Sequence, residues 1–323
     1  MKMLVTGGAG FIGSHIVARL LKENHSVVVL DNFFSGKESN LSFAMDRGLS
    51  TVDFTLIRGD IRDYEACTKA CRGVDVIFHQ AALRSVPRSM EYPQEYNDVN
   101  INGTLNLLRA AVESDARKFV FASSSSIYGK TDKFPENENE YPMPISPYAL
   151  TKLVGEYYCK IYAGNFNLHT VALRYFNVFG PRQALDDDYA VVIPKFISCM
   201  LNDEAPPIHG TGRQSRDFTY IEDVVTANIC AAQADNASGE VFNVANGRTH
   251  SILSLVDILN RILGKSIAPV FTPARAGDVP KSLADTAKAR RLLNFQGTIG
   301  FEEGLRRTVE YFEDSRRSVV SSR

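Results

Sequence analysis

The sequence has no excess of charge of either sign. Its 323 residues contain 36 Lys and Arg and 37 Asp and Glu, which gives a formal net charge of −1. A chain without a strong field of one sign has little attraction for nucleic acid or for an anionic membrane. We therefore expect neither as a partner, and a small molecule as the ligand.

The sequence also lacks a long hydrophobic run. No uninterrupted apolar stretch approaches the roughly 20 residues that a membrane helix needs. Met1 leads directly into the strand-like residues Met3 to Val5, without the layout of a signal peptide. We therefore expect a soluble, cytoplasmic protein.

The sequence contains few cysteines, and their number is odd. The five cysteines are scattered along the chain: Cys67, Cys71, Cys159, Cys199 and Cys230. Such a set is typical of free buried thiols in a reducing compartment and not of a disulfide framework. No second Cys or His pair completes a zinc site beside Cys67 and Cys71, and the six histidines do not cluster. We predict that the protein holds no metal.

Short apolar runs alternate with amphipathic stretches of helix length. This rhythm predicts an α/β fold of the Rossmann type, a doubly wound parallel sheet with helices on both faces. Seven segments have the composition of strands: 3–6, 26–30, 54–57, 74–78, 119–122, 169–173 and 241–244. Residues 26–30 lose the alternation of inward and outward side chains, as central parallel strands do.

The alternation of strand-like and helix-like segments becomes irregular after about residue 175. Gly180-Pro181 and Pro206-Pro207 interrupt the pattern, and a helix-rich tail follows from Ile252. Residues 241–244 nevertheless have the composition of a last strand of the first sheet. We therefore expect a larger domain of residues 1–175 and 219–250, interleaved with a smaller α/β domain of residues 176–218 and 251–323.

Glycines occupy the first, fourth and seventh places of residues 7–13, where the first predicted strand turns into a helix. Gly7 permits a tight turn, and Gly10 lets a pyrophosphate approach the positive end of the helix. Gly13 permits close packing of the helix on the sheet. In this context a dinucleotide site is favoured over a plain glycine-rich turn.

Polar residues follow the next predicted strands. Asp31 ends the second strand, where a carboxylate accepts hydrogen bonds from the adenosine ribose and repels a 2′-phosphate. NAD is thus favoured over NADP, although Lys37 nearby leaves NADP open. Residues after the third and fourth strands lie at the same ligand-binding edge: Asp60-Ile61 and Gln80-Ala81-Ala82. For Asp60 a loop-capping role is an equal alternative.

Tyr148 and Lys152 are four residues apart in a predicted helix, so both lie on one face. A Lys ammonium stabilises the phenolate of a Tyr whose usual pKa is about 10, and the charge of a bound nicotinamide lowers that pKa further. The serines at 123–126 end the preceding strand and offer a hydroxyl to the phenol. Together with the glycine turn, these residues predict a tyrosine base that works near neutral pH.

The residues from Gly7 to Gly13, Ser124 and the Tyr148 and Lys152 pair resemble the extended short-chain dehydrogenase/reductase family, from Met1 to about Phe312. Residues 79–89, 173–180 and 215–218 are similar to those of nucleotide-sugar 4-epimerases, and most similar to the UDP-N-acetylglucosamine 4-epimerase branch. This resemblance implies a Rossmann-type domain that binds NAD and a smaller domain that binds a UDP-sugar.

The resemblance implies roles for individual residues. Ser124 matches the catalytic serine, Tyr148 the base, and Lys152 a bridge between Tyr148 and the nicotinamide ribose. The positions that match contacts to NAD are Gly7, Gly10, Phe11, Ile12, Gly13, Asp31, Asn32, Ser35, Gly36, Asp60, Ile61, Gln80, Ala81, Ala82, Asn100, Tyr148, Lys152 and Tyr175.

A second set of positions matches contacts to the UDP-sugar. Asn177, Arg216 and Arg275 would contact the diphosphate, since guanidinium groups suit phosphate oxygens, and Asp278 would hold the uridine ribose. The complete set is Arg84, Ser85, Ser124, Ser125, Ser126, Tyr148, Asn177, Val191, Arg216, Arg275, Asp278 and Ser282.

Two departures from related enzymes bear on the substrate. Dehydratases of the family carry Thr-Asp-Glu where this chain has Ser124-Ser125-Ser126, so the acid and base for removal of water are absent. Epimerases specific for unsubstituted hexoses carry a Tyr where this chain has Ser282, and a small side chain leaves space for an N-acetyl group. Arg84, in contrast, resembles the Lys of the hexose enzymes.

The resemblance therefore implies reversible inversion of C4 of a UDP-sugar through a transient 4-keto sugar. UDP-GlcNAc and UDP-GalNAc are the expected pair, with activity on UDP-Glc and UDP-Gal left open. UDP-glucuronate 4-epimerase, UDP-glucose 4-epimerase and a catalytically silent NAD-binding module are the alternatives. The resemblance also implies a homodimer, in which helices at about 92–111 and 147–162 of each subunit form a four-helix bundle.

Overall fold

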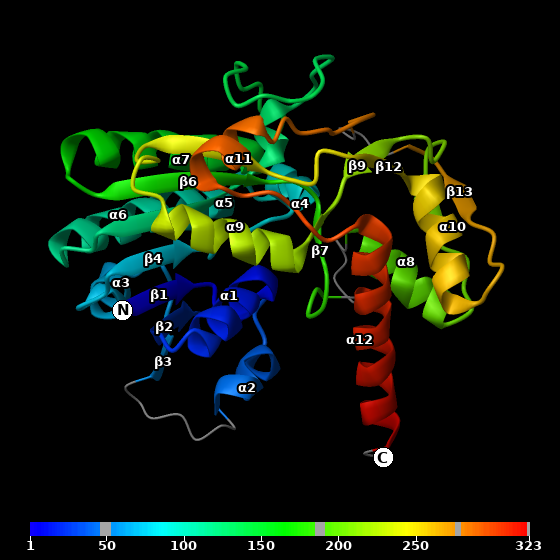
Figure 1. Ribbon diagram of the computed structural model, residues 1–323, viewed down its shortest axis with the longest axis horizontal. Coiled ribbons are helices and arrows are strands. Elements are labelled where there is room, and N and C mark those ends of the chain that lie inside the picture. The colour runs from blue at the N-terminus through cyan, green and yellow to red at the C-terminus, as the bar shows by residue number, and fades with distance from the viewer. Residues whose placement is uncertain (46–52, 185–190, 275–278, 322–323) are drawn as a thin grey trace.

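A seven-stranded parallel sheet forms the centre of the protein (Figure 1). The computed structural model describes residues 1–45, 53–184, 191–274 and 279–321. The order across the sheet is β11-β6-β5-β4-β1-β2-β3. The strands are β1 Lys2–Thr6, β2 Ser26–Asp31, β3 Phe54–Arg58, β4 Val76–His79, β5 Lys118–Ser124, β6 His169–Tyr175 and β11 Glu240–Val244. The predicted Rossmann-type fold and its seven strands are confirmed, although β4 begins two residues later than predicted.

The strand order reverses at β1. From β1 the chain moves outward to β2 and β3, then returns to β4 on the other side of β1. Thr6 at the end of β1 is therefore opposite Leu30 of β2 and His79 of β4. Such a switch point leaves a crevice at the carboxyl edge of the sheet. The glycine turn, Asp31 and Gln80 all follow strand ends at this edge.

Helices cover both faces of the sheet. One face packs against α1 (Phe11–Lys22) and α9 (Ile221–Gln233), and the other against α3 (Tyr64–Cys71), α6 (Gly103–Glu113) and α7 (Pro147–Asn165). Side chains of β1 alternate between these layers: Met3 and Val5 join the first core and Leu4 the second. Because both faces are buried, the strands are apolar on both sides.

The helical stretch expected at about 92–111 is formed by three consecutive segments, and a short separate helix precedes it. The separate helix is α4 (Val86–Glu91), and the stretch consists of α5 (Pro93–Tyr96), a π-helical segment (Asn97–Asn102) and α6. Pro93 explains the break between α4 and α5, since it lacks the N–H that would continue α4. In contrast α7 runs unbroken from Pro147, and the Ser146 side chain caps it by accepting a hydrogen bond from Ala149 N.

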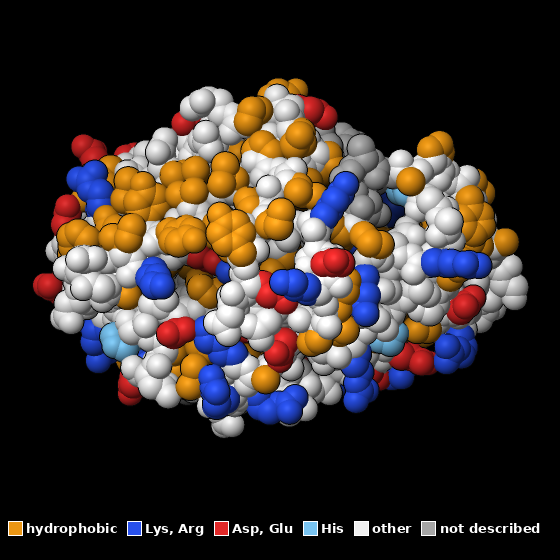
Figure 2. All heavy atoms as spheres, turned by 90° about the horizontal axis from the view of Figure 1, so that it is seen from above, with side chains coloured by type: hydrophobic (Ala, Val, Ile, Leu, Met, Phe, Trp, Pro, Cys, Tyr) orange, Lys and Arg blue, Asp and Glu red, His pale blue; other side chains and the backbone are white. Residues whose placement is uncertain are grey.

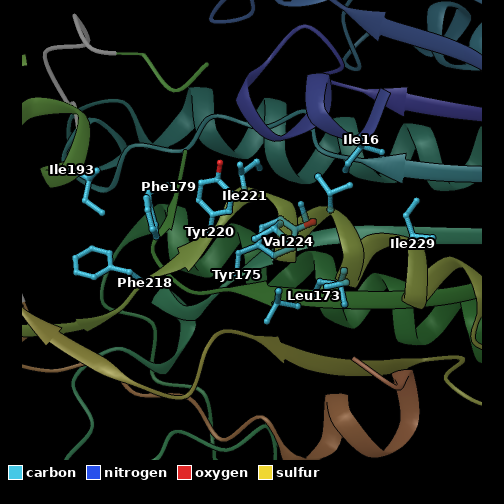
Figure 3. Packing of buried hydrophobic residues seen from close by; sticks show 14 of the residues in the cluster. Ile16, Leu173, Tyr175, Phe179, Ile193, Phe218, Tyr220, Ile221, Val224 and Ile229 are labelled. Carbon is cyan, nitrogen blue, oxygen red and sulfur yellow. The ribbon is translucent and has the colours of Figure 1, made fainter. Parts of the chain in front are cut away.

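A smaller part of the molecule extends beyond the carboxyl edge of the sheet (Figure 1). Its core continues that of the sheet, since Ile193, Phe179 and Phe218 join the cluster that includes Leu173 and Ile16 (Figure 3). The remaining elements are η1 Glu38–Leu41, α2 Ser42–Met45, η3 Ser125–Tyr128, β7 Val178–Phe179, α8 Val192–Leu201, β8 Pro207–His209, β9 Ser215–Asp217, β10 Thr219–Tyr220, β12 Thr249–Ser251, α10 Ile252–Leu263, β13 Val270–Thr272, α11 Ala287–Leu293 and α12 Phe301–Ser321.

The cysteines and the apolar character of the helices bear on two expectations from the sequence. All five cysteines are free, and four of them are buried, as predicted. Within the described ranges, no helix combines the length and the apolar character needed to span a membrane.

Candidate active site

A cleft of about 1930 Å³ opens at the carboxyl edge of the sheet and reaches the smaller part of the molecule. Every residue predicted to contact NAD lines this cleft except Asn100. The predicted substrate residues that line it are Arg84, Ser85, Ser124, Ser125, Ser126, Tyr148, Asn177, Val191, Arg216 and Ser282. Arg275 and Asp278 lie outside the described residues. The cleft thus brings together residues from positions 7 to 282 of the chain.

The glycine turn forms a cradle at the start of α1. Gly7 has φ +67°, a conformation that favours glycine, and its carbonyl accepts a hydrogen bond from Gly10 N. A Cβ on Gly13 would lie 2.1 Å from Gly7 O, so the helix packs directly on the turn. A Cβ on Gly10 would meet only Gly7 O, at 3.1 Å. The backbone N–H groups at this helix end are therefore accessible from the cleft, which fits the pyrophosphate of a dinucleotide.

Asp31 organises the loop that follows β2. Its Oδ2 accepts a hydrogen bond from Ala9 N at 2.9 Å and its Oδ1 one from Phe33 N at 2.8 Å. Burial raises the pKa of Asp31, and these two hydrogen bonds oppose the rise. Each carboxylate oxygen still has acceptor capacity for a ribose hydroxyl. Gly36 lies close to Asp31, since a Cβ there would be 3.0 Å from Oδ1.

Asp60 caps its own loop and also lines the cleft. Its Oδ1 accepts from Arg62 N at 2.8 Å, which is the loop-capping arrangement. Its Oδ2 accepts from Asn32 Nδ2 at 2.7 Å, which links the ends of β3 and β2. Hydrogen bonds from the Arg62 side chain are the largest of the causes that lower the pKa of Asp60 to about 2. Asp60 is thus an ionised carboxylate that lines the cleft beside Asp31.

Tyr148 lies at the first turn of α7, in the floor of the cleft. Burial raises its pKa above the usual value, while a hydrogen bond with Ser124 and the positive charge of Arg84 lower it. The sequence predicts a lowered pKa, so in the chain by itself burial outweighs the lowering effects. Ser124 is in turn fixed by its neighbour, because its Oγ accepts hydrogen bonds from Ser126 N at 3.2 Å and Ser126 Oγ at 2.9 Å.

Lys152 lies one turn along α7 from Tyr148, as predicted. Its ammonium donates a hydrogen bond to Ala122 O at 2.8 Å and sits 5.1 Å from the centre of the Phe121 ring. Burial lowers the pKa of Lys152 to about 7. The carbonyl of Ala122 therefore holds the amine at the end of β5, next to the serines.

Tyr175 belongs to a buried polar network at the end of β6. Its hydroxyl donates to Asn228 Oδ1 at 3.0 Å, and Gln80 Nε2 donates to the same hydroxyl at 3.1 Å. Asn228 is anchored in α9 by a bond from its Nδ2 to Val224 O. Burial raises the pKa of Tyr175, so this phenol stays neutral. Sequence reasoning missed Asn228, because an Asn within an amphipathic helix gives no sign of what it faces.

Asn100 is buried behind the cleft. Its Oδ1 accepts from Leu83 N at 2.8 Å, and its Nδ2 donates to Leu83 O and to Thr151 Oγ1. Asn100 therefore ties the segment after β4 to α7. In this structure it is a positioning residue that does not line the cleft, and its expected contact with NAD stays a prediction.

Ser282 and Asn177 meet in the smaller part of the cleft. Asn177 Nδ2 donates to Ser282 Oγ at 3.0 Å and to Asp217 O at 2.9 Å. Asn177 has φ +34°, which is uncommon for a residue other than glycine. The Asp217 carboxylate in turn accepts hydrogen bonds from the backbone N–H groups of Asn246, Gly247 and Ala284. The cleft wall at Ser282 is thus fixed by several segments.

A buried ion pair beneath the serines was also missed by sequence reasoning. Arg174 of β6 donates two hydrogen bonds to Glu156 of α7, at 2.9 and 2.8 Å. Ser123 Oγ donates to the same carboxylate at 2.5 Å. The signal in the sequence was the spacing of Tyr148, Lys152 and Glu156, which puts Glu156 on the face of α7 that carries the other two.

No group of three or more His, Cys, Asp or Glu is placed to hold a metal ion in the part of the chain that the structure describes.

The chain is similar to known proteins over nearly its whole length. The NAD dependent epimerase/dehydratase family matches residues 3–245. A UDP-N-acetylglucosamine 4-epimerase from Methanobrevibacter ruminantium, solved in complex with UDP-N-acetylmuramic acid, is 41% identical, with a TM-score of 0.91 over 97% of this chain and 98% of that one. A Thermotoga maritima UDP-glucose 4-epimerase with UDP-glucose is 38% identical, with a TM-score of 0.92 over 98% and 100%.

A Bacillus cereus UDP-glucuronic acid 4-epimerase, solved with UDP-glucuronic acid and NAD, is 36% identical, with a TM-score of 0.89 over 98% of this chain and 100% of that one. The resemblance to nucleotide-sugar 4-epimerases is confirmed, and so is NAD as the cofactor. Because this family matches three quarters of the sequence and the relatives align over nearly all of it, the chain belongs to the NAD-dependent epimerase/dehydratase family.

Proposed function

We propose that the protein inverts C4 of a UDP-sugar, with UDP-GlcNAc and UDP-GalNAc as its main pair and UDP-Glc and UDP-Gal as further substrates. The observation that carries this proposal is the position of Tyr148. Its phenol lies in the floor of the cleft with Ser124 and Arg84 beside it, and the glycine cradle opens into the same cleft.

Different residues of this chain serve the removal of the O4 proton and the orientation of the base. Tyr148 takes the O4 proton, and Ser124 holds the phenol by a hydrogen bond. NAD, when bound, supplies the acceptor and donor of the C4 hydride and a positive charge that lowers the pKa of Tyr148. Arg84 contributes a second positive charge near the phenol.

Inversion requires that the sugar present both faces in turn. The nucleotide must then be held firmly and the hexose loosely. Arg216, which lines the smaller part of the cleft, is suited to the diphosphate, since a guanidinium matches phosphate oxygens. The hydroxyls of Ser124, Ser125 and Ser126 suit the hexose, because a hydroxyl both donates and accepts and so serves either face.

The size of Ser282 supports an N-acetylated sugar. Its side chain is small and nearly buried, and a larger residue there would project into the cleft. The Methanobrevibacter relative is called a UDP-N-acetylglucosamine 4-epimerase, whereas the Thermotoga and Bacillus relatives act on UDP-glucose and UDP-glucuronic acid by name. UDP-glucuronate is the second candidate, because three serine hydroxyls at 124–126 also suit a sugar carboxylate.

Product analysis tests the proposal. The purified protein is incubated separately with UDP-GlcNAc, UDP-Glc and UDP-glucuronate in the presence of NAD, and the C4 epimers are separated and identified. We expect UDP-GalNAc to form fastest. Faster conversion of UDP-glucuronate would select the second candidate, and absence of every epimer with intact NAD binding would select a silent binding module.

We further propose that the protein forms a homodimer through α7 and the α4 to α6 region. Leu150, Tyr157 and Ile161 of α7 are 48%, 55% and 49% exposed, at spacings that put Tyr157 and Ile161 on one face. Figure 2 views the side on which α7 lies in Figure 1 and shows hydrophobic side chains gathered there. Light scattering tests this, with Tyr157→Glu and Ile161→Glu together expected to give monomers.

A further inference from the structure

Arg182 connects the smaller part of the molecule to the start of α1. It follows the short strand β7, and its Nη1 donates a hydrogen bond to Ser14 O at 3.1 Å. The guanidinium also lies 4.9 Å from the centre of the Phe43 ring of α2. Ser14 is in the first turn and a half of α1, directly after the glycine cradle. Arg182 therefore reaches across 168 residues of sequence to the edge of the predicted cofactor site.

The backbone of Arg182 adopts an uncommon conformation. Its φ is +64°, in the left-handed region that few residues other than glycine occupy. Gln183, which is buried, fixes this turn by donating from Nε2 to Val178 O at 3.1 Å. A conformation of this kind persists where the surrounding structure holds it, and such residues cluster at ligand sites.

Within residues 1–45, 53–184, 191–274 and 279–321, the charge of Arg182 has no acidic partner. Among the residues that the structure describes, no carboxylate lies within ion-pair distance of its guanidinium. Burial lowers the pKa of Arg182, and the group that opposes this lowering is the phenol of Tyr311. The side chain nevertheless lines the cleft, so the charge can be balanced by an anion that enters there.

A dinucleotide brings such an anion to this end of the cleft. Its diphosphate carries about two negative charges, whereas a helix N-terminus such as that of α1 supplies only about half a positive charge. The residues predicted to contact NAD include one cationic side chain, Lys152, and that amine is hydrogen-bonded at the end of β5. Lys37 and Arg182 are further cationic side chains that line the cleft, and the guanidinium of Arg182 is hydrogen-bonded to α1.

We propose that the Arg182 guanidinium binds the diphosphate of NAD and thereby links the smaller part of the molecule to the cofactor. The proposal rests on the binding of NAD at the glycine cradle. Arg182 reaches α1, just after the cradle, from the segment that follows β7, and Asn177, on the other side of β7, meets Ser282 in the cleft. Cofactor binding and the geometry of the sugar pocket are thus connected through one short strand. An epimerase that restores NAD in each cycle gains from such a link, because the cofactor never needs to leave.

Calorimetry of NAD binding tests this without any turnover. Arg182→Met keeps an apolar stem against Phe43 and removes the charge, so the Kd for NAD is expected to rise about tenfold or more, as for loss of a charged hydrogen bond. The Kd for ADP should rise with it, and the Kd for UDP should stay within about twofold. Arg19→Met is the matched control, since Arg19 lies on α1, pairs with Glu23 and does not line the cleft.

The outcomes separate the two proposals. An unchanged Kd for NAD in the folded Arg182→Met protein, or a rise for UDP alone, would overturn the role of Arg182. Arg182→Gln, which keeps a donor for Ser14 O without the charge, answers the same question if the Met variant unfolds. A chain whose NAD affinity depends on Arg182 but which epimerises no UDP-sugar would keep this inference and remove the proposed function.

Discussion

Glu156 of α7 and Arg174 of β6 form a buried, two-pronged ion pair directly beneath the serines that face the cleft. The two hydrogen bonds are 2.9 and 2.8 Å long, and both side chains are about 95% buried. The guanidinium also lies 4.8 Å from the centre of the Tyr128 ring. This pair fixes the helix that carries Tyr148 and Lys152 against the strand that neighbours the serines.

Loss of one member of this pair should destabilise the protein strongly. Glu156→Gln leaves Arg174 buried without a compensating charge, and we expect the free energy of unfolding to fall by about 3 to 5 kcal/mol. Glu303→Gln is the control, because Glu303 pairs with Arg307 at the surface, where water screens the charges, and should cost far less than Glu156→Gln. Urea denaturation measures both, and equal losses would contradict the assigned role of burial.

Replacement of the proposed base should separate turnover from cofactor binding. Tyr148→Phe removes the only proton acceptor of that side chain, so kcat should fall by about 100-fold or more, while the Kd for NAD stays near that of the wild type. Tyr158→Phe on the same helix is the control, since Tyr158 does not line the cleft. Wild-type kcat in the Tyr148 variant would show that another group takes the proton.

A ring at position 282 should change the choice of sugar. Ser282→Tyr fills the space proposed for the N-acetyl group, so kcat/KM for UDP-GlcNAc should fall by about 100-fold relative to that for UDP-Gal. Ser282→Ala removes the hydroxyl that accepts from Asn177 without adding bulk, and should affect both substrates alike. Kinetics with the two sugars side by side measures the ratio, and an equal loss in the Tyr variant would refute the proposal that Ser282 leaves space for the N-acetyl group.

His79 should make the fold sensitive to acid. It is fully buried between the hydroxyls of Thr6 and Thr104, and burial, with the charge of Lys152, lowers its pKa to about 3. An unfolded His has a pKa of about 6.5. Below pH 6.5 the unfolded chain therefore binds a proton that the folded protein refuses, so stability present above pH 6.5 is lost as the pH falls towards 3.

A comparison of variants isolates this effect. His79→Gln removes the titration, so the difference in stability between wild type and variant should shrink as the pH falls, by up to about 1.4 kcal/mol per pH unit. Thermal unfolding at pH 5, 6 and 7.5 measures that difference. A difference that stays constant with pH would mean that His79 does not titrate with unfolding.

The sheet and the cofactor turn could be predicted from the sequence because both rest on local patterns. Apolar runs such as 26–30 identify central strands. The three glycines at 7, 10 and 13, placed at a strand-to-helix turn, predict a site for a dinucleotide. The helical stretch at about 92–111 is implied by the resemblance alone, and α5, the π-helical segment and α6 occupy that range. The interleaved domain boundaries, the dimer and the cytoplasmic location stay predictions.

The rest of the site depends on contacts between distant segments. In the sequence, nothing distinguishes three of the charged residues from those on the surface. Only the fold shows that Arg182 contacts α1 and that Glu156 and Arg174 form an ion pair in the core. Burial is the reason that the pKa of Tyr148 is raised and not lowered, and the spacing of residues in the sequence does not show how deeply a side chain is buried. Asn100 likewise has a role that only the fold shows, since its side chain accepts a hydrogen bond from Leu83 N in the segment after β4.

The fate of the hydrogen at C4 tests the central claim most directly. UDP-GlcNAc that carries deuterium at C4 is incubated with the protein and NAD in ordinary water, and the product is examined by mass spectrometry and proton NMR. A hydrogen that leaves and returns as hydride does not exchange with solvent, so the account predicts UDP-GalNAc that keeps its deuterium at C4. Loss of the deuterium to water, or recovery of UDP-GlcNAc alone, would contradict it.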